Sequence, residues 1–119
     1  MVTIEWLDET NYVFHVQMSG DWTWKEFYDN YAALEKALFN ATTPATILFD
    51  STLETSAPAH CKSHMVAITR MMPRRVSSVV FITSSTQCKD VPRLMRRIRP
   101  NDHIAFHHAN TIRDALRFI

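Results

Sequence analysis

The sequence has 119 residues, of which 46% are hydrophobic and 21% are charged, and its formal net charge is +1. These proportions are typical of one globular domain and exclude a disordered chain. The near-neutral charge argues against nucleic-acid binding, so we expect no nucleic-acid partner. No apolar run is long enough to cross a bilayer, and the N-terminus lacks a signal-peptide pattern. We therefore expect a cytoplasmic protein with no transmembrane segment.

Two rare residue types narrow the chemistry further. Gly20 is the only glycine, and it cannot by itself form the glycine-rich loops that cradle nucleotide phosphates. The two cysteines, Cys61 and Cys88, are too few for a disulfide framework. No set of acid, base and nucleophile can be assembled from the sequence. We therefore expect a protein that is not an enzyme and needs no cofactor.

The predicted elements begin with two strands. Residues 2–7 and 12–18 alternate apolar and polar side chains, and residues 8–11 form a turn between them. Such a short turn indicates an antiparallel hairpin. Because Ser19, Gly20 and Asp21 follow, we expect the second strand to end there.

A first helix follows the hairpin. Thr23 and Glu26 have the spacing of a capping box, in which a hydroxyl and a carboxylate satisfy the free N–H groups of a helix start. This predicts a helix over roughly residues 24–40. Its apolar stripe consists of Phe27, Tyr31, Leu34 and Leu38.

The middle of the chain predicts a strand, a loop and a second helix. Residues 46–49 form an apolar run that Asp50 ends, which suits a strand buried on both faces. Residues 51–59 are polar and predict a loop. The second helix ends at Pro73, and its apolar stripe consists of Cys61, Met65, Ile68 and Met72. The stripe favours a core role for Cys61 over a reactive thiol at a helix start.

The last third of the chain repeats this alternation. Residues 76–83 predict the strongest strand, and Asp90 can cap a third helix that buries Val91, Leu94, Met95 and Ile98. Residues 103–107 predict a last strand. Asn110 is the expected cap of a final helix, whose inner stripe would be Ile112, Ala115, Leu116 and Ile119.

The predicted order is therefore ββαβαβαβα. It indicates an α/β fold: a single domain over residues 1–119, with a mixed, mostly parallel five-stranded sheet. Parallel neighbours need crossover helices, and these are almost always right-handed. Four helices can leave part of the sheet or of the hairpin uncovered, and we therefore expect that a homodimer can form.

Four segments carry a family resemblance over nearly the whole chain. They are Met18-Ser-Gly-Asp21, Ile47-Leu-Phe-Asp50, the strand Val79–Thr83 with its helix Val91–Ile98, and the strand Ile104–Phe106 with the helix that follows it. In order and spacing they resemble the STAS family, the fold of bacterial anti-sigma-factor antagonists and of the cytoplasmic tail of sulfate transporters. The resemblance implies a non-enzymatic regulatory or protein-interaction module. The fold is also related to the lipid-binding CRAL-TRIO domains.

The chain departs from the family where its members are phosphorylated. Anti-sigma antagonists carry Asp-Ser-Ser/Thr-Gly at the start of the second helix, whereas this chain reads Glu54-Thr-Ser-Ala-Pro-Ala-His60. Thr55 and Ser56 are left as candidate phospho-acceptors, and a phosphate near a helix N-terminus would be electrostatically favourable. The alternative is that both hydroxyls only cap or solvate the loop.

Two surfaces are candidate binding sites. Open α/β sheets bind ligands at the carboxyl ends of their strands. Loops 51–59 and 84–90 should meet at this edge. The residues expected there are Asp50, Ser51, His60, Ser84 and Ser85. The second surface is basic and would suit an acidic protein, an anionic ligand or an anionic membrane, unless it is simply solvated. Its residues are Arg74, Arg75, Lys89, Arg93, Arg96 and Arg97.

Other residues leave alternatives open. His60 and His64 could chelate a metal from one helix face, but no further ligands are evident, so we expect no metal. Trp22 and Trp24 would either staple the start of the first helix or mark a binding surface. The second functional hypothesis is a carrier of a small apolar ligand or lipid, for which adaptable methionines are suited; they are Met65, Met71, Met72 and Met95.

Overall fold

The computed structural model of the chain describes residues 1–8, 12–83, 91–98 and 104–119. Five strands form one sheet in the order β1-β2-β3-β4-β5, with β1 antiparallel to β2 and all other neighbours parallel. The predicted mixed, mostly parallel α/β fold is confirmed. The strands are β1 (Val2–Asp8), β2 (Val13–Gly20), β3 (Ala45–Glu54), β4 (Val76–Ile82) and β5 (Ala105–Ala109). The helices are α1 (Trp24–Phe39), α2 (Cys61–Arg70), α3 (Val91–Ile98) and α4 (Ile112–Ala115), and α4 continues as a 3₁₀ helix, Leu116–Phe118.

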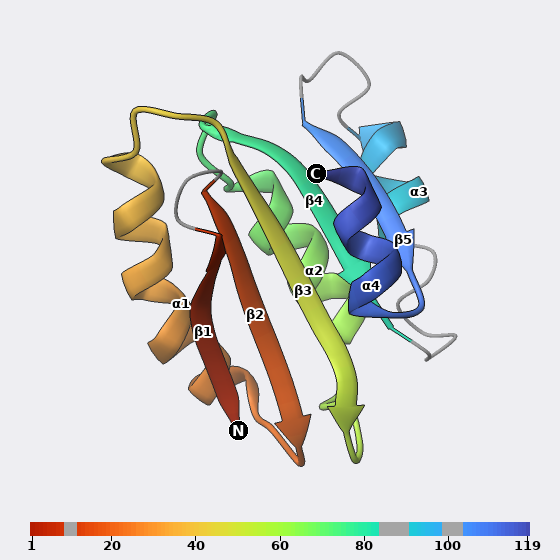
Figure 1. Cartoon of the computed structure of the whole chain (residues 1–119). Coiled ribbons are helices and arrows are strands. Elements are labelled where there is room, and N and C mark those ends of the chain that lie inside the picture. The colour runs from red at the N-terminus through yellow and green to blue at the C-terminus, as the bar shows by residue number, and fades with distance from the viewer. Residues whose placement is uncertain (9–11, 84–90, 99–103) are drawn as a thin grey trace.

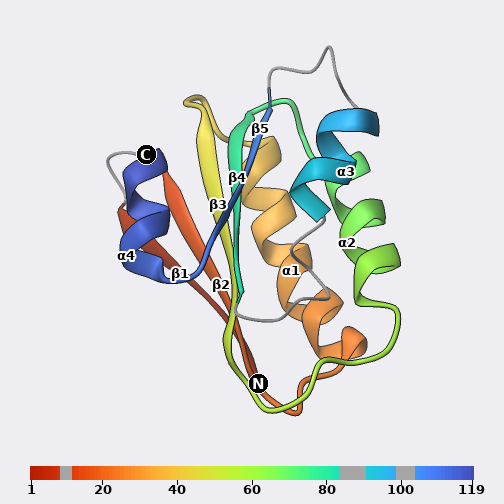
Figure 2. The same cartoon turned by 90° about the vertical axis from the view of Figure 1, so that its right-hand side faces the viewer.

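The strand order determines how the helices are layered. Each crossover adds the next parallel strand on the same side, and right-handed crossovers in one direction place their helices on one face. Figures 1 and 2 show this arrangement: α1, α2 and α3 lie on one face of the sheet, and α4 lies on the other. No described helix is both long and apolar enough to span a bilayer.

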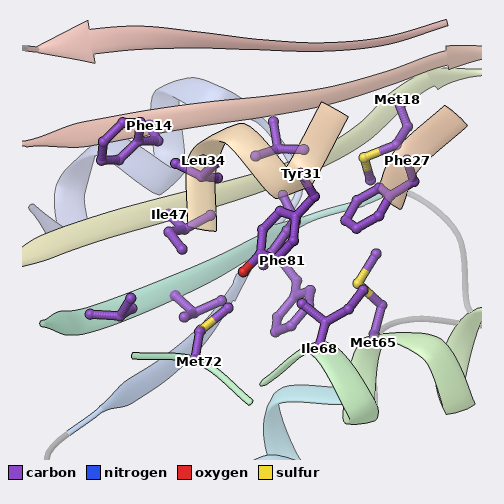
Figure 3. Close-up of a cluster of buried hydrophobic side chains, with 14 of the residues drawn as sticks. Phe14, Met18, Phe27, Tyr31, Leu34, Ile47, Met65, Ile68, Met72 and Phe81 are labelled. Atoms are coloured by element: carbon purple, nitrogen blue, oxygen red, sulfur yellow. The ribbon is translucent and has the colours of Figure 1, made fainter. Parts of the chain in front are cut away.

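The main core lies between the sheet and the three crossover helices (Figure 3). Phe27 stacks on Tyr31 with ring centroids 5.4 Å apart, and Phe49 stacks on Phe81 at 5.5 Å. The predicted stripes of the first two helices are buried here, Cys61 among them. A smaller cluster lies on the opposite face and consists of Val13, Leu48, Val80, Ile82, Ala109 and Ala115.

The start of α1 follows the capping prediction in part. The Thr23 hydroxyl accepts a hydrogen bond from the Glu26 N–H at 3.2 Å, as a capping residue should. The Glu26 carboxylate instead accepts from the N–H of Val2 in β1 at 3.0 Å. One glutamate therefore joins the helix start to the outermost strand.

The strand β3 is longer than predicted. Residues 51–54, predicted as loop, continue the strand, and beyond a bulge in the pairing they lie beside Ser19 and Gly20 of β2. The Thr55 N–H then donates to the Gly20 carbonyl at 2.9 Å. Local sequence could not reveal this extension, because it depends on backbone pairing with a strand more than thirty residues earlier.

The C-terminal segment corrects two further predictions. Thr111, rather than Asn110, caps α4: its hydroxyl accepts from the Asp114 N–H at 3.1 Å. Leu116 and Ile119 do not belong to an inner stripe, since they are 45% and 49% exposed. The change to a 3₁₀ helix after Ala115 alters the spacing on which the stripe depends. The strand β5 also begins two residues later than predicted.

Replacing Thr23 tests the cap of α1. Thr23→Ala removes the acceptor for the Glu26 N–H, and we expect the free energy of unfolding to fall by about 1 kcal/mol. Urea denaturation followed by circular dichroism measures this. Thr23→Ser is the matched control because it keeps the hydroxyl, and it should stay close to the wild type. Equal losses in both variants would contradict the capping role.

Candidate functional site

Asp50 is buried near the carboxyl end of β3, and its carboxylate is fully engaged within the fold. Its Oδ2 atom lies 2.8 Å from Nε2 of His15 in β2. Its Oδ1 atom accepts from the Thr52 N–H at 2.9 Å and from the Thr52 hydroxyl at 2.6 Å. Because an ionised carboxylate can only accept, Nε2 of His15 carries the proton in this contact.

This pair lies on the face of the sheet that carries α4. Asp50 follows Leu48 by two residues, and His15 follows Val13 by two, so all four share the face of the smaller cluster. The structure therefore separates Asp50 from α2 and from His60, with which the sequence grouped it. His15 is a residue that sequence analysis missed.

The surroundings of Asp50 favour its ionised form. Burial would raise the pKa of Asp50, but the hydrogen bonds from His15 and Thr52 outweigh burial and hold this pKa below its ordinary value. On the other side of the imidazole, Glu5 Oε1 lies 3.7 Å from His15 Nδ1. His15 thus lies between two carboxylates, one buried and one exposed.

The other residues predicted at the carboxyl edge, and the predicted phospho-acceptor Ser56, differ in their surroundings. The Ser51 hydroxyl points to the Ile82 carbonyl at 3.4 Å, and the Ser56 hydroxyl donates to the Asp21 carboxylate at 2.8 Å. His60 precedes α2 in a left-handed conformation, with φ of 64°, and makes no side-chain cap. Ser84 and Ser85 lie outside the described residues.

The second histidine of the suggested metal pair is held against α1. His64 stacks on Trp24 with ring centroids 4.2 Å apart, and its Nδ1 lies 2.7 Å from the Tyr28 hydroxyl. Trp24 in turn donates through Nε1 to the Ala59 carbonyl at 2.8 Å. Within the described part of the chain, no three or more His, Cys, Asp or Glu residues are grouped to hold a metal ion.

A small cavity lies beneath the start of α2. Its volume is about 10 Å³, which is room for about one water molecule. Cys61 is among its lining residues and is buried, which agrees with the predicted core role of this thiol. The rest of the apolar lining consists of Met18, Trp22, Phe49, Met65 and Phe81.

A basic depression lies between α2 and α3. Lys62, Arg93 and Arg97 line it together with Leu94, and its volume is about 210 Å³. We call it the α2–α3 basic depression. Arg93 and Arg97 belong to the basic surface that the sequence predicts. Lys62 was missed, although its place beside Cys61 puts it on the flank of the apolar stripe of α2.

The other predicted cations that the structure describes, Arg74, Arg75 and Arg96, do not line this depression. Arg96 donates through Nε and Nη2 to the Phe106 carbonyl in β5, at 3.0 and 2.6 Å. Arg74 and Arg75 are exposed in the turn after α2, at the end of the helix away from Lys62. Lys89 lies outside the described residues.

Lowering the pH tests the pair of Asp50 and His15. Asp50 has a lower pKa in the folded chain than its unfolded value of about 3.9, so its stabilisation is complete above that value and is lost as pH falls through the folded pKa. Asp50→Asn should lower the free energy of unfolding by about 2 kcal/mol at neutral pH. It should also flatten the loss of stability in acid, measured by urea denaturation over a pH series. Asp29→Asn, on the exposed face of α1, is the control, and a variant curve parallel to the wild type in acid would contradict the assignment.

Comparison with known proteins shows a likeness of fold. No family model matches the sequence, and no curated protein matches it. A solved structure of an uncharacterised protein of the DUF3478 family from Shewanella loihica PV-4, described as having a SpoIIAA-like fold, superposes with a TM-score of 0.65. The two chains are 17% identical over 99% of this chain and 91% of the other. This chain therefore has a SpoIIAA-like α/β fold, the STAS-like fold that its sequence resembles.

Proposed function

We propose that this chain is a non-enzymatic interaction module that binds an acidic segment of a protein partner. The partner would contact the α2–α3 basic depression and, as the sequence predicts, segments 51–59 and 84–90, of which 84–90 lies outside the described residues. Regulation by such binding is what the STAS resemblance implies. The observation that carries the proposal is the convergence of cations from two helices on one hollow surface.

The charges of the depression are available to a partner. Lys62, Arg93 and Arg97 are exposed, and no carboxylate of the described residues forms an ion pair with them. Like charges that line one depression repel each other. The negative charges of an acidic partner relieve this repulsion, and the attraction orients the partner on the surface. Leu94 lies between the cations and is half-buried, which adds an apolar contact at the centre.

The alternative, a carrier of a small apolar ligand, has less support. The cavity beneath α2 holds about 10 Å³, whereas ligand pockets usually measure some hundreds of cubic ångströms. Met65, Met72 and Met95 are buried in packed core, and Met71 is 73% exposed. These methionines therefore do not surround a ligand-sized space in the described part of the chain.

The catalytic possibility is also weak. Asp50, a buried carboxylate, is hydrogen-bonded to His15 and Thr52 on the face of the sheet away from α2 and α3. Its low pKa makes it a poor proton donor near neutral pH. Thr55 and Ser56 stay as predicted phospho-acceptors. A phosphate on Ser56 would add charge beside Asp21, the present partner of the Ser56 hydroxyl.

Charge reversal on α3 tests the proposed recognition. The probe is a fluorescein-labelled peptide of glutamate and leucine, whose binding is followed by fluorescence anisotropy at two salt concentrations. We expect the wild type to bind and salt to weaken binding. Arg93→Glu with Arg97→Glu should weaken binding at least about tenfold, which corresponds to about 1.4 kcal/mol.

The matched control changes the same charge elsewhere. Arg113 and Arg117 are exposed at the C-terminal helices, on the other face of the sheet. Arg113→Glu with Arg117→Glu should leave peptide binding within about twofold of the wild type. Equal losses in both double variants would mean non-specific attraction. Absence of binding by the wild type would overturn recognition of acidic segments.

Native mass spectrometry separates the module from the carrier. Because the cavity beneath α2 has room for only about one water molecule, we expect freshly purified protein to show the mass of the polypeptide alone. A retained apolar molecule, released when the protein is denatured, would favour the carrier instead.

A further inference from the structure

We propose that the outer edge of β1 pairs antiparallel with β1 of a second copy of this chain, so that one sheet continues across a homodimer. This interface is separate from the α2–α3 basic depression and does not rest on its proposed function.

The pairing with β2 shows which groups of β1 point outward. Met1 and Ser19 exchange both of their backbone hydrogen bonds, with N···O distances of 2.5 and 2.8 Å. Hydrogen-bonded pairs alternate along an antiparallel ladder, so Thr3 and Glu5 also face β2. The N–H and C=O groups of Val2, Ile4 and Trp6 therefore point away from the sheet.

Within the described residues, most of these outward groups have no partner. The Val2 N–H is taken by the Glu26 carboxylate at 3.0 Å. For Ile4 and Trp6, no other described residue provides a partner to the outward N–H. Segment 2–6 reads Val-Thr-Ile-Glu-Trp, which favours extended structure and contains no proline or lysine to discourage pairing.

The opposite edge of the sheet is protected better. The strand β5 has only five residues, and α3 packs beside it. Arg96 of α3 places its guanidinium on the Phe106 carbonyl of this strand. Short strands and charged side chains on the backbone are usual ways to block an edge, so β1, which is longer and keeps the outward groups of Ile4 and Trp6, is the less protected of the two edges.

The side chains next to β1 leave room for another strand. A groove of about 270 Å³ runs between β1 and α1, and its apolar lining includes Ile4, Trp6, Phe14, Ala33, Leu34 and Ala37. The two alanines are exposed, and their small size leaves space for the side chains of a strand added at the edge. Trp6 is 43% exposed and would be covered there.

The sequence of β1 suits pairing with itself when the two-fold axis lies at Ile4. In this register Ile4 faces Ile4 of the second copy, Trp6 faces Val2, and Glu5 faces Thr3. The two isoleucines exchange two hydrogen bonds, and each Trp6 pairs with a Val2 whose N–H Glu26 releases on pairing. An axis at Glu5 would instead place two carboxylates opposite each other, which destabilises pairing. Pairing at Ile4 thus sets apolar side chains opposite each other and keeps the two Glu5 carboxylates apart, which suits a second copy of this chain as the occupant.

Disulfide trapping tests both the edge and the register, in full-length protein carrying Cys88→Ser. In the proposed dimer the Cα atoms of residue 4 in the two copies should be about 5.5 Å apart, a distance that a disulfide can span. Ile4→Cys should therefore give a covalent dimer on mild oxidation. The matched control is Trp6→Cys. In the proposed dimer the residues at position 6 of the two copies would lie about four residues apart along the strands, or about 14 Å. Cysteines at this position should therefore not cross-link. Cross-linking at Trp6 but not at Ile4 would overturn the proposed register.

Sedimentation velocity over a concentration series tests association without cysteines. The wild type should pass from monomer to dimer as its concentration rises. Ile4→Pro removes an outward N–H without breaking a bond to β2, so it should abolish the dimer while circular dichroism keeps the native signal. If that variant unfolds, the cross-linking pattern decides. A wild type that stays monomeric would overturn the proposal and leave the edge to a strand of another protein. A dimer that persists in folded Ile4→Pro would place the interface elsewhere and would equally overturn it.

Discussion

The direction in which the sheet grows is the constraint on which the rest of this structure depends. Each crossover adds a strand on the same side, so the three crossover helices share one face, as Figure 2 shows. That face has enough helix to build the main core. Among the described elements, the other face carries α4, which packs against β4 and β5, and the 3₁₀ helix that follows it. The polar pair of His15 and Asp50 lies on this second face, where the strands have less helical cover and the two side chains satisfy each other.

This asymmetry also determines where recognition can occur. Open α/β sheets often bind ligands in a crevice at the carboxyl ends of their strands. Here Asp50 turns to His15, Ser56 bonds to Asp21, and the space beneath α2 is about the size of one water molecule. The described polar groups at the carboxyl edge are thus largely engaged within the fold. The proposed recognition therefore depends mainly on the cations on the outward sides of α2 and α3.

Local rules predicted the elements whose causes are local. The spacing of Thr23 and Glu26 was enough to place the start of α1, and helical periodicity was enough to identify the buried stripes of α1 and α2. The end of β3 and the contact between His15 and Asp50 depend on parallel pairing between β2 and β3. That pairing joins residues about thirty-five positions apart, so a single sequence could show His15 only as one polar position in an alternating strand. Knowledge of the strand order would have shown that His15 and Asp50 lie on the same face of the sheet.

The three arginines of α3 show how identical side chains acquire different roles. Arg93, Arg96 and Arg97 belong to one basic cluster in the sequence, yet Arg96 binds the Phe106 carbonyl and becomes part of the sheet edge. Burial, and then the positive charge of Arg96, lower the pKa of His107, which favours the neutral ring that stacks on Phe118. Arg96 therefore contributes to the fold, and its replacement would disturb β5 as well as the surface next to Arg96. Arg93 and Arg97 have no such bond to the described residues, and together with Lys62 they supply the positive charge of the α2–α3 basic depression.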